Sequence, residues 1–185
     1  MAEQFDHISG KLIDFIARQH IFFCASAADG TRVNVTPRPI EYLRITSPNQ
    51  AVFLDLTGSG NETAAHMLAD GRLTLMFCAV SGPPLILRLY GRGRSVQRDT
   101  PEFAELFDMH ICGDIPINAR QIFVQEIDLV QTSCGYGVPL FEFKQERPAL
   151  RNWAAERSEA DIREYWDEKN RTSMDGLPTG VFGGD

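Results

Sequence analysis

The sequence lacks the features that mark secreted, membrane-spanning or zinc-binding proteins. Its four cysteines form no CxxC pair and no cluster with histidine at the spacing of a zinc site. The opening residues, MAEQFDHISG, contain no basic region followed by an apolar stretch, and no apolar run approaches the roughly 18 residues of a membrane span. We therefore expect a cytoplasmic protein with reduced thiols, no membrane association and no metal site.

Positive charge is also scarce. Eighteen lysines and arginines stand against 25 acidic residues, which gives a net charge of −7 without any basic run. Binding to nucleic acids and to anionic membranes depends on clustered basic side chains. Neither partner is expected.

Familiar catalytic motifs are missing as well. The four histidines show no HExxH or other ligand spacing, no GxSxG sequence is present, and no cysteine lies in a nucleophile motif. No catalytic residue can be assigned from the sequence. If the protein is an enzyme, a cofactor is expected to carry the chemistry.

What the sequence does contain is a series of short strand-like segments. Apolar residues at helical spacing predict an amphipathic helix over 3–19. Strand patterns then follow at 21–27, 31–37, 40–45, 51–56, 73–79, 85–96 and 122–130. Short helices are expected at 61–70 and at 101–110, where Pro101 suits a first helical position after a cap at Asp99 or Thr100.

This order of elements favours a mainly antiparallel β-barrel with flanking helices over a doubly wound parallel sheet, because most strands are joined by short turns. At 185 residues the chain fits one domain with an appendage. From residue 149 the composition shifts to charged residues and helix formers. We expect a barrel domain over 1–148 and a helical tail over 149–185 that packs on the barrel or on a partner subunit.

A glycine-rich turn provides the most informative local pattern. TGSGNETAAHM, residues 57–67, follows an apolar strand and opens a helix, where free backbone N–H groups can hold a phosphate. Ser59, Asn61 and Thr63 add polar side chains. The pattern is neither a Walker A loop nor a dinucleotide fingerprint. The alternative is an ordinary helix start capped by Ser59 or Asn61.

Two strands carry polar rows. On LILRLYGRGRSV, alternation places Arg88, Arg92 and Arg94 on one face, which suggests attraction for a phosphate or carboxylate. Pairing with surface acids is the preferred alternative for Arg92 and Arg94, and both readings stay open for Arg88. On RVNVTPRP, polar side chains alternate with valines, which is typical of a ligand groove and equally of any half-buried strand.

Together these segments resemble the pyridoxamine 5′-phosphate oxidase-like family of FMN-binding split barrels, and within it an uncharacterised oxidase-related subgroup. The resemblance spans about residues 5–135, through RVNVTPRP, FLDLTGSGNETAAHM, LTLMFCA and LRLYGRGRSV, and NRTSMDGLP is similar to a C-terminal motif of the subgroup. It implies a Greek-key-like split β-barrel that forms a homodimer with FMN at the subunit interface.

The resemblance also assigns cofactor-binding residues. In the family, the strand matching 32–38 lies along the flavin and the segment matching 56–63 meets the phosphate. The positions implied here are Asn34, Val35, Thr36, Pro37, Arg38, Leu56, Ser59, Asn61, Glu62 and Thr63. Because Glu62 stands where the true oxidases have basic residues, we expect Arg32, Arg38 or Arg88, or the helix dipole, to meet the phosphate charge.

The expected function is that of an FMN-dependent oxidoreductase with an unidentified small-molecule substrate and NAD(P)H as a candidate electron donor. The C-terminal Arg/His substrate motif of the true oxidases is not evident, which argues against vitamin B6 oxidation. A non-catalytic module that stores or senses flavin is the main alternative. A β-barrel that binds another small ligand is the third.

Overall fold

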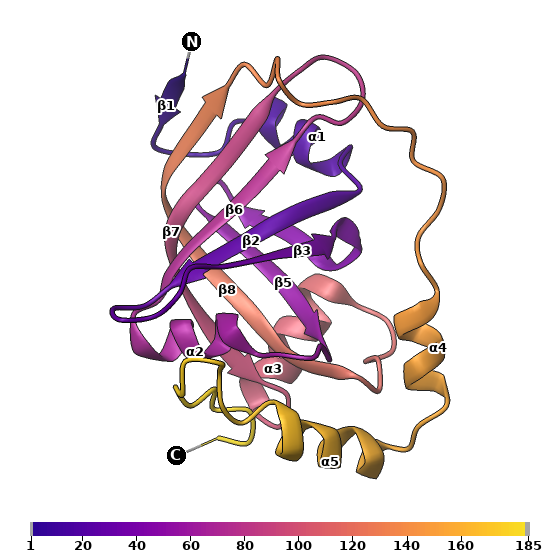
Figure 1. Ribbon diagram of the computed structural model, residues 1–185. Helices are drawn as coiled ribbons and strands as arrows, with labels where there is room; N and C mark the ends of the chain where they lie inside the picture. Colours follow the sequence, from indigo (N-terminus) through magenta and orange to yellow (C-terminus); the bar gives the residue numbers. More distant parts are fainter. Residues whose placement is uncertain (1, 184–185) are drawn as a thin grey trace.

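The computed structural model describes residues 2–183, and its centre is a strongly twisted antiparallel sheet (Figure 1). The order of hydrogen-bonded strands is β3-β2-β6-β7-β8-β5-β4, and β1 pairs with β8 outside this path. The strands are β1 (Glu3–Phe5), β2 (Ile21–Ala27), β3 (Asn34–Pro39), β4 (Leu43–Ser47), β5 (Gln50–Leu56), β6 (Arg72–Cys78), β7 (Ile86–Gln97) and β8 (Ala119–Ser133). The prediction of a mainly antiparallel β-fold with flanking helices is confirmed.

The helices lie around this sheet, which forms a half-barrel. They are α1 (Gly10–Ala17), the short turn η1 (Ile40–Tyr42), α2 (Glu62–Ala69), α3 (Pro101–Leu106) with its π-helical continuation η2 (Phe107–Ile111), α4 (Ala149–Ala155) and α5 (Glu159–Lys169). Thr100 caps α3 by accepting a 3.2 Å bond from the Phe103 N–H, which decides between the two predicted caps. Across the described residues, no helix is both long and apolar enough to span a bilayer.

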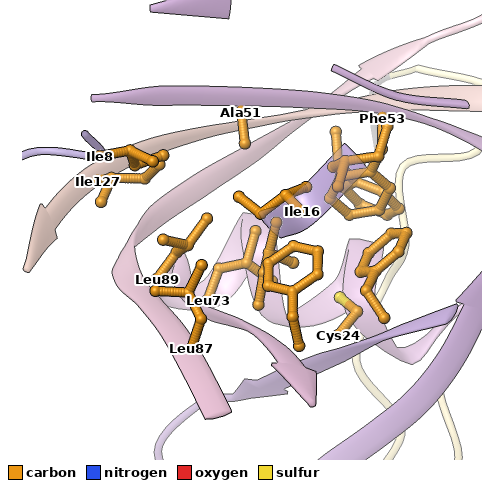
Figure 2. Close-up of a cluster of buried hydrophobic side chains, with 14 of the residues drawn as sticks. Ile8, Ile16, Cys24, Ala51, Phe53, Leu73, Leu87, Leu89 and Ile127 are labelled. Atoms are coloured by element: carbon orange, nitrogen blue, oxygen red, sulfur yellow. The ribbon is translucent and has the colours of Figure 1, made fainter. Parts of the chain in front are cut away.

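Two clusters of buried side chains hold the sheet. On the inner face, rings from three strands meet, with centroids 5.5 Å apart for Phe22–Phe53 and 5.1 Å for Phe53–Phe123. Figure 2 shows this cluster, with Ile16 of α1 among its side chains. The second cluster joins α3 and η2 to the other face. Ala51 and Phe53 belong to the first cluster and Val52 and Leu54 to the second. Residues 51–54 of β5 are therefore all apolar because both faces of the strand are covered there.

Two residue types mark special backbone positions. Pro37 and Pro39, which lack a backbone N–H, are tolerated in β3 because this strand is at an edge of the sheet. Among the described strands it pairs on one side alone, with β2, so the N–H groups on its other side are not needed for strand pairing. Gly91 sits where β7 crosses β8 at a register shift. A β-carbon there would lie 1.9 Å from the Glu126 carbonyl oxygen, so only glycine permits this approach.

Several predicted boundaries were wrong. Residues 3–5 pair with the free edge of β8 instead of starting a helix, and the helix begins only at Gly10. The strand expected at 31–37 runs over 34–39. The one expected at 40–45 begins as η1 and becomes β4 only at Leu43. For residues 3–5 the pairing with β8, a contact over more than 100 residues of sequence, overrides the local pattern.

The C-terminal tail contacts the barrel of its own chain. Trp166 of α5 is buried and donates from Nε1 to Thr57 Oγ1 at 2.7 Å. Arg163 pairs with Asp99 at 2.6 Å. The tail was expected over 149–185, of which the last two residues lie outside the described part of the chain. The chain that follows α5, shown in yellow in Figure 1, runs beneath α2.

Candidate functional site

A cavity of about 500 Å³ opens between β3, the end of β5 and the turn that leads into α2. We call it the polar cavity. It brings together these predicted residues: Asn34, Thr36, Pro37, Arg38, Leu56, Ser59, Asn61, Glu62 and Thr63. On β3 the alternation of the strand turns Asn34, Thr36 and Arg38 toward it.

A buried cluster of charges forms the floor of the polar cavity. Asp55, at the end of β5, is 1% exposed and accepts from Arg38 Nη1, from Arg120 Nη2 at 2.8 Å and from Gln121 Nε2 at 2.7 Å. Burial by itself would raise the pKa of the Asp55 carboxyl, but the charges of Arg120 and Arg38 outweigh it and lower the pKa to about 2. With two guanidinium groups against one carboxylate, the cluster carries one surplus positive charge.

Two donors at the polar cavity have no partner among the described residues. They are Arg38 Nε and Asn61 Nδ2, and Asn61 is only 3% exposed. Gln121 Nε2 donates to Asn61 Oδ1 at 2.7 Å, which fixes the amide so that its NH₂ group is the unpaired end. An unpaired buried donor costs about 1–3 kcal/mol. The pattern therefore fits a site that a ligand with acceptor oxygens would complete.

The start of α2 is open in the same way. Asn61 and not Ser59 is at the N-cap, and no side chain of the described residues makes a capping hydrogen bond there. The alternative of an ordinary side-chain cap by Ser59 or Asn61 is therefore wrong. The first N–H groups of an uncapped helix favour an anion.

Glu62, the unexpected acid at this turn, has a partner in the tail. Both of its carboxylate oxygens lie 3.1 Å from the backbone nitrogen of Met174, which donates to them. The Glu62 carboxylate is thus already hydrogen-bonded to the tail. An acid at this position is therefore compatible with an anion site at the same turn.

Asn170 at the end of α5 also fixes the glycine turn, residues 57–61, by hydrogen bonds. Asn170 is fully buried, donates to the Gly58 carbonyl at 3.2 Å and accepts from Arg120 Nη1 at 2.7 Å. Arg120 in turn donates to the Gly60 carbonyl at 3.1 Å. The glycine turn is therefore fixed by α5 and β8, two elements far from it in sequence.

A second chain of hydrogen bonds leads inward from β3. Thr36 donates to Asn34 Oδ1 at 3.3 Å, and Asn34 Nδ2 donates to Thr63 Oγ1 at 3.2 Å and to Ser26 Oγ at 3.3 Å. Ser26 Oγ is hydrogen-bonded to His66 Nδ1 at 2.9 Å. Ser26 and His66 are both buried, so this pair orients Asn34 and offers no accessible nucleophile.

Three predicted residues lie elsewhere. The Arg32 guanidinium pairs with Asp175 of the tail, and Val35 faces outward with 58% exposure. Arg88 donates to Ser133 Oγ at 3.3 Å on β8. Of the three arginines proposed for the phosphate, the structure brings only Arg38 to the polar cavity. Arg94 pairs with Glu102 at 2.5 Å, which confirms the alternative that this arginine pairs with a surface acid.

Four polar residues of the site were missed by sequence reasoning: Asp55, Arg120, Gln121 and Asn170. A signal existed for Asp55, which is a lone acid inside the apolar strand AVFLDL. Arg120 and Gln121 fall just before the predicted limit of their strand, and nothing local marks Asn170. Within residues 2–183, no three His, Cys, Asp or Glu side chains are arranged to hold a metal ion.

A second cavity, of about 710 Å³, adjoins the first. We call it the apolar cavity. The two share Pro37, Arg38, Pro39, Tyr42, Leu56 and Leu150. Its outer wall is the connecting segment, residues 134–148, which runs from β8 to α4 along one side of the molecule (Figure 1).

Comparisons with known structures agree with the fold. A HupZ variant from Group A Streptococcus matches with a TM-score of 0.53 at 14% identity, over 68% of this chain and 99% of the other. A proposed pyridoxamine 5′-phosphate oxidase from Lactobacillus delbrueckii gives a TM-score of 0.53 at 15% identity, over 68% and 94%. At such low identity these matches establish the fold alone.

Comparisons of sequence go further. The family model described as pyridoxamine 5′-phosphate oxidase matches residues 8–134. The pyridoxamine 5′-phosphate oxidase family protein ustO of Aspergillus flavus is 32% identical over 190 residues, covering 94% of this chain and 76% of that protein. This chain belongs to the pyridoxamine 5′-phosphate oxidase family.

Proposed function

We propose that the protein binds FMN in the polar cavity and acts as a flavin-dependent oxidoreductase on a small molecule. The observation that carries this proposal is the buried cluster of Arg38, Arg120 and Asp55, with its surplus positive charge beside unpaired donors and an open helix start. A phosphate would match all three features at once.

The residues that would hold the phosphate are those of the turn and the helix start. Ser59, Asn61 and Thr63 supply side-chain donors, and the glycines leave backbone N–H groups accessible. Arg120 acts indirectly, because it fixes the Gly60 carbonyl and Asp55. Arg38 adds its unpaired Nε–H. It also adds positive charge, because the single Asp55 carboxylate is paired with both Arg38 and Arg120.

FMN is favoured over FAD because the sequence contains no pyrophosphate-binding fingerprint. The volume of about 500 Å³ suits one cofactor of this size. When bound, FMN supplies hydride transfer, and the chain supplies binding and orientation. Asn34 and Thr36, already fixed by Ser26 and Thr63, would present oriented polar groups to it.

Membership of the family supports a homodimer with the cofactor at the subunit boundary as part of this proposal, and NAD(P)H is the candidate electron donor. A protein that only stores or senses flavin is the alternative. The two differ in turnover: the oxidoreductase is reduced by NADH or NADPH and reoxidised by an acceptor over many cycles, whereas the storage protein is not.

The first test is the protein as purified. It should be yellow, release FMN on denaturation, and sediment as a dimer. Arg38→Gln should lower flavin content at least tenfold, whereas Arg18→Gln, an exposed arginine at the end of α1, should not. Release of FAD would overturn the choice of cofactor, and equal flavin content in the two variants would overturn the site.

A further inference from the structure

The apolar cavity is lined by aromatic and aliphatic side chains. Phe23 of β2, Tyr42 of η1 and Leu56 of β5 form its inner wall. Phe141 and Phe143 of the connecting segment face them from the outer wall. A cavity of about 710 Å³ with such walls is the size and chemistry of a site for a small organic molecule.

Its aromatic rings retain surface that a ligand could cover. The Phe143 ring stacks on His20 with centroids 3.8 Å apart and planes 5° from parallel, yet Phe143 stays 51% exposed. Exposed aromatic rings that line a concave surface are typical of binding sites for flat apolar ligands.

Acids outnumber bases among the charged side chains that line this cavity and not the polar cavity. Apart from Arg38, which lines both cavities and is paired with Asp55, the lining contains two arginines and three glutamates: Arg147, Arg151, Glu41, Glu142 and Glu146. Arg151 is paired with Glu41 at 2.6 Å. A phosphate or carboxylate here would meet a wall with one more acid than base, in contrast to the polar cavity.

The wall formed by the connecting segment is held by few contacts. Among the described residues, the wall is held by the hydrogen bond from the Phe141 N–H to the Val80 carbonyl at 2.8 Å and by the stacking of Phe143 on His20. A wall attached at so few points can move to admit a ligand at little cost.

We propose that the apolar cavity binds the substrate, and that this substrate is an uncharged aromatic molecule and not a phosphate ester. The inference rests on the proposed function, since the shared residues Pro37, Arg38 and Leu56 place the two cavities side by side. The phosphate-binding part of the site is then reserved for the cofactor, and substrate recognition is by ring stacking and apolar contact.

The test uses the protein as purified, with its flavin content measured, and two probes that differ only in a phosphate: 2-naphthol and 2-naphthyl phosphate. Naphthol should bind at one site per chain, at least tenfold more tightly than naphthyl phosphate, and should shift the visible absorption of the bound flavin. Phe143→Ala should weaken naphthol binding at least fivefold. Leu140→Ala is the matched control, because Leu140 lies in the same segment, is 75% exposed and does not line the cavity.

Tighter binding of naphthyl phosphate, or equal binding in the two variants, would overturn the inference. Binding of naphthol without a shift in the flavin spectrum would also overturn it, because the cavity would not then adjoin the cofactor. If the purified protein holds no flavin even after incubation with FMN, the proposed function fails. Tighter binding of naphthol than of naphthyl phosphate would in that case still support an apolar aromatic ligand for the cavity.

Discussion

Two irregular stretches of chain flank the site, and they are attached to the barrel in different ways. The last described residues, 170–183, contain the buried side chains of Asn170, Ser173 and Thr179. Asn170 donates to the Gly58 carbonyl in the glycine turn, and the Met174 N–H donates to Glu62 of α2. The connecting segment is exposed over residues 139–148. The residues 170–183 thus support the glycine turn of the polar cavity through hydrogen bonds, whereas the connecting segment is an exposed wall with few contacts.

Under the proposed function, the two stretches have different roles. A cofactor that stays bound needs a rigid, preformed site, which the residues 170–183 and the buried charge cluster would provide. A substrate that must enter and leave needs a wall that opens at low cost. The following predictions test each half of this comparison, beginning with the largest effect.

Removing the charge of Asp55 should cause the greatest damage. Asp55→Asn keeps the shape of the side chain but leaves Arg38 and Arg120 buried without their anion. We expect the free energy of unfolding to fall by about 3–5 kcal/mol, measured by urea denaturation. Asp128→Asn, an exposed acid on β8, should change it by less than about 0.5 kcal/mol. A loss for Asp55→Asn as small as that of the control would mean that the cluster does not hold the cavity.

Acid should weaken the same cluster. The pKa of Asp55 lies near 2 in the folded protein, below the ordinary value of 3.8, so its contribution is present above about pH 4 and is lost as the pH falls from 4 to 2. The loss should be roughly 2 kcal/mol. Unfolding curves of the wild type and of Asp55→Asn between pH 5 and 2 measure it, and the steeper decline should belong to the wild type. Parallel declines would contradict the assignment.

Truncating Asn170 tests the tail. Asn170→Ala removes the acceptor of Arg120 Nη1 and the donor to the Gly58 carbonyl. It should cost about 1–2 kcal/mol of stability and weaken flavin binding, because the glycine turn loses its support. Asn152→Ala, at an exposed position on α4, is the control for both measurements. Unchanged flavin affinity in a destabilised Asn170 variant would show that the tail stabilises the fold without organising the site.

The smallest effect on stability should come from the connecting segment. Phe143→Ala removes a half-exposed ring whose main contact is His20. The free energy of unfolding should fall by less than about 1 kcal/mol, measured by urea denaturation, and flavin content should not change. A larger loss, or a loss of flavin, would mean that this wall is as integral as the tail.

The parts of this account that could be predicted from the sequence are those with a local pattern. Alternation along β3 predicted the polar row of Asn34 and Thr36, and the glycine turn predicted the start of a helix, with free N–H groups or a side-chain cap as the two alternatives. The charge cluster could not be predicted, because Asp55 meets Gln121 only through the pairing of β5 with β8. Strand pairing also explains the error at residues 3–5, where Phe5 fits the helical spacing of the apolar residues that follow it.

The contribution of the tail could not be predicted either. Asn170 lies 112 residues from its partner Gly58, and no repeat or spacing joins them. The acid at Glu62 appeared unfavourable for a phosphate until its partner, the Met174 N–H, was seen. Such long-range polar contacts depend on the packing of α5 against the barrel, which single-sequence patterns do not specify.

The central claim is that the polar cavity binds FMN through its phosphate, and one measurement tests it most directly. Calorimetric titration of flavin-stripped protein should give an affinity for FMN at least tenfold higher than for riboflavin, which lacks the phosphate. Asn61→Asp, which replaces the unpaired NH₂ group with a carboxylate oxygen, should reduce that ratio to about one, while Asn152→Asp leaves it unchanged. Equal affinities for FMN and riboflavin in the wild type, or an unchanged ratio in Asn61→Asp, would contradict the account.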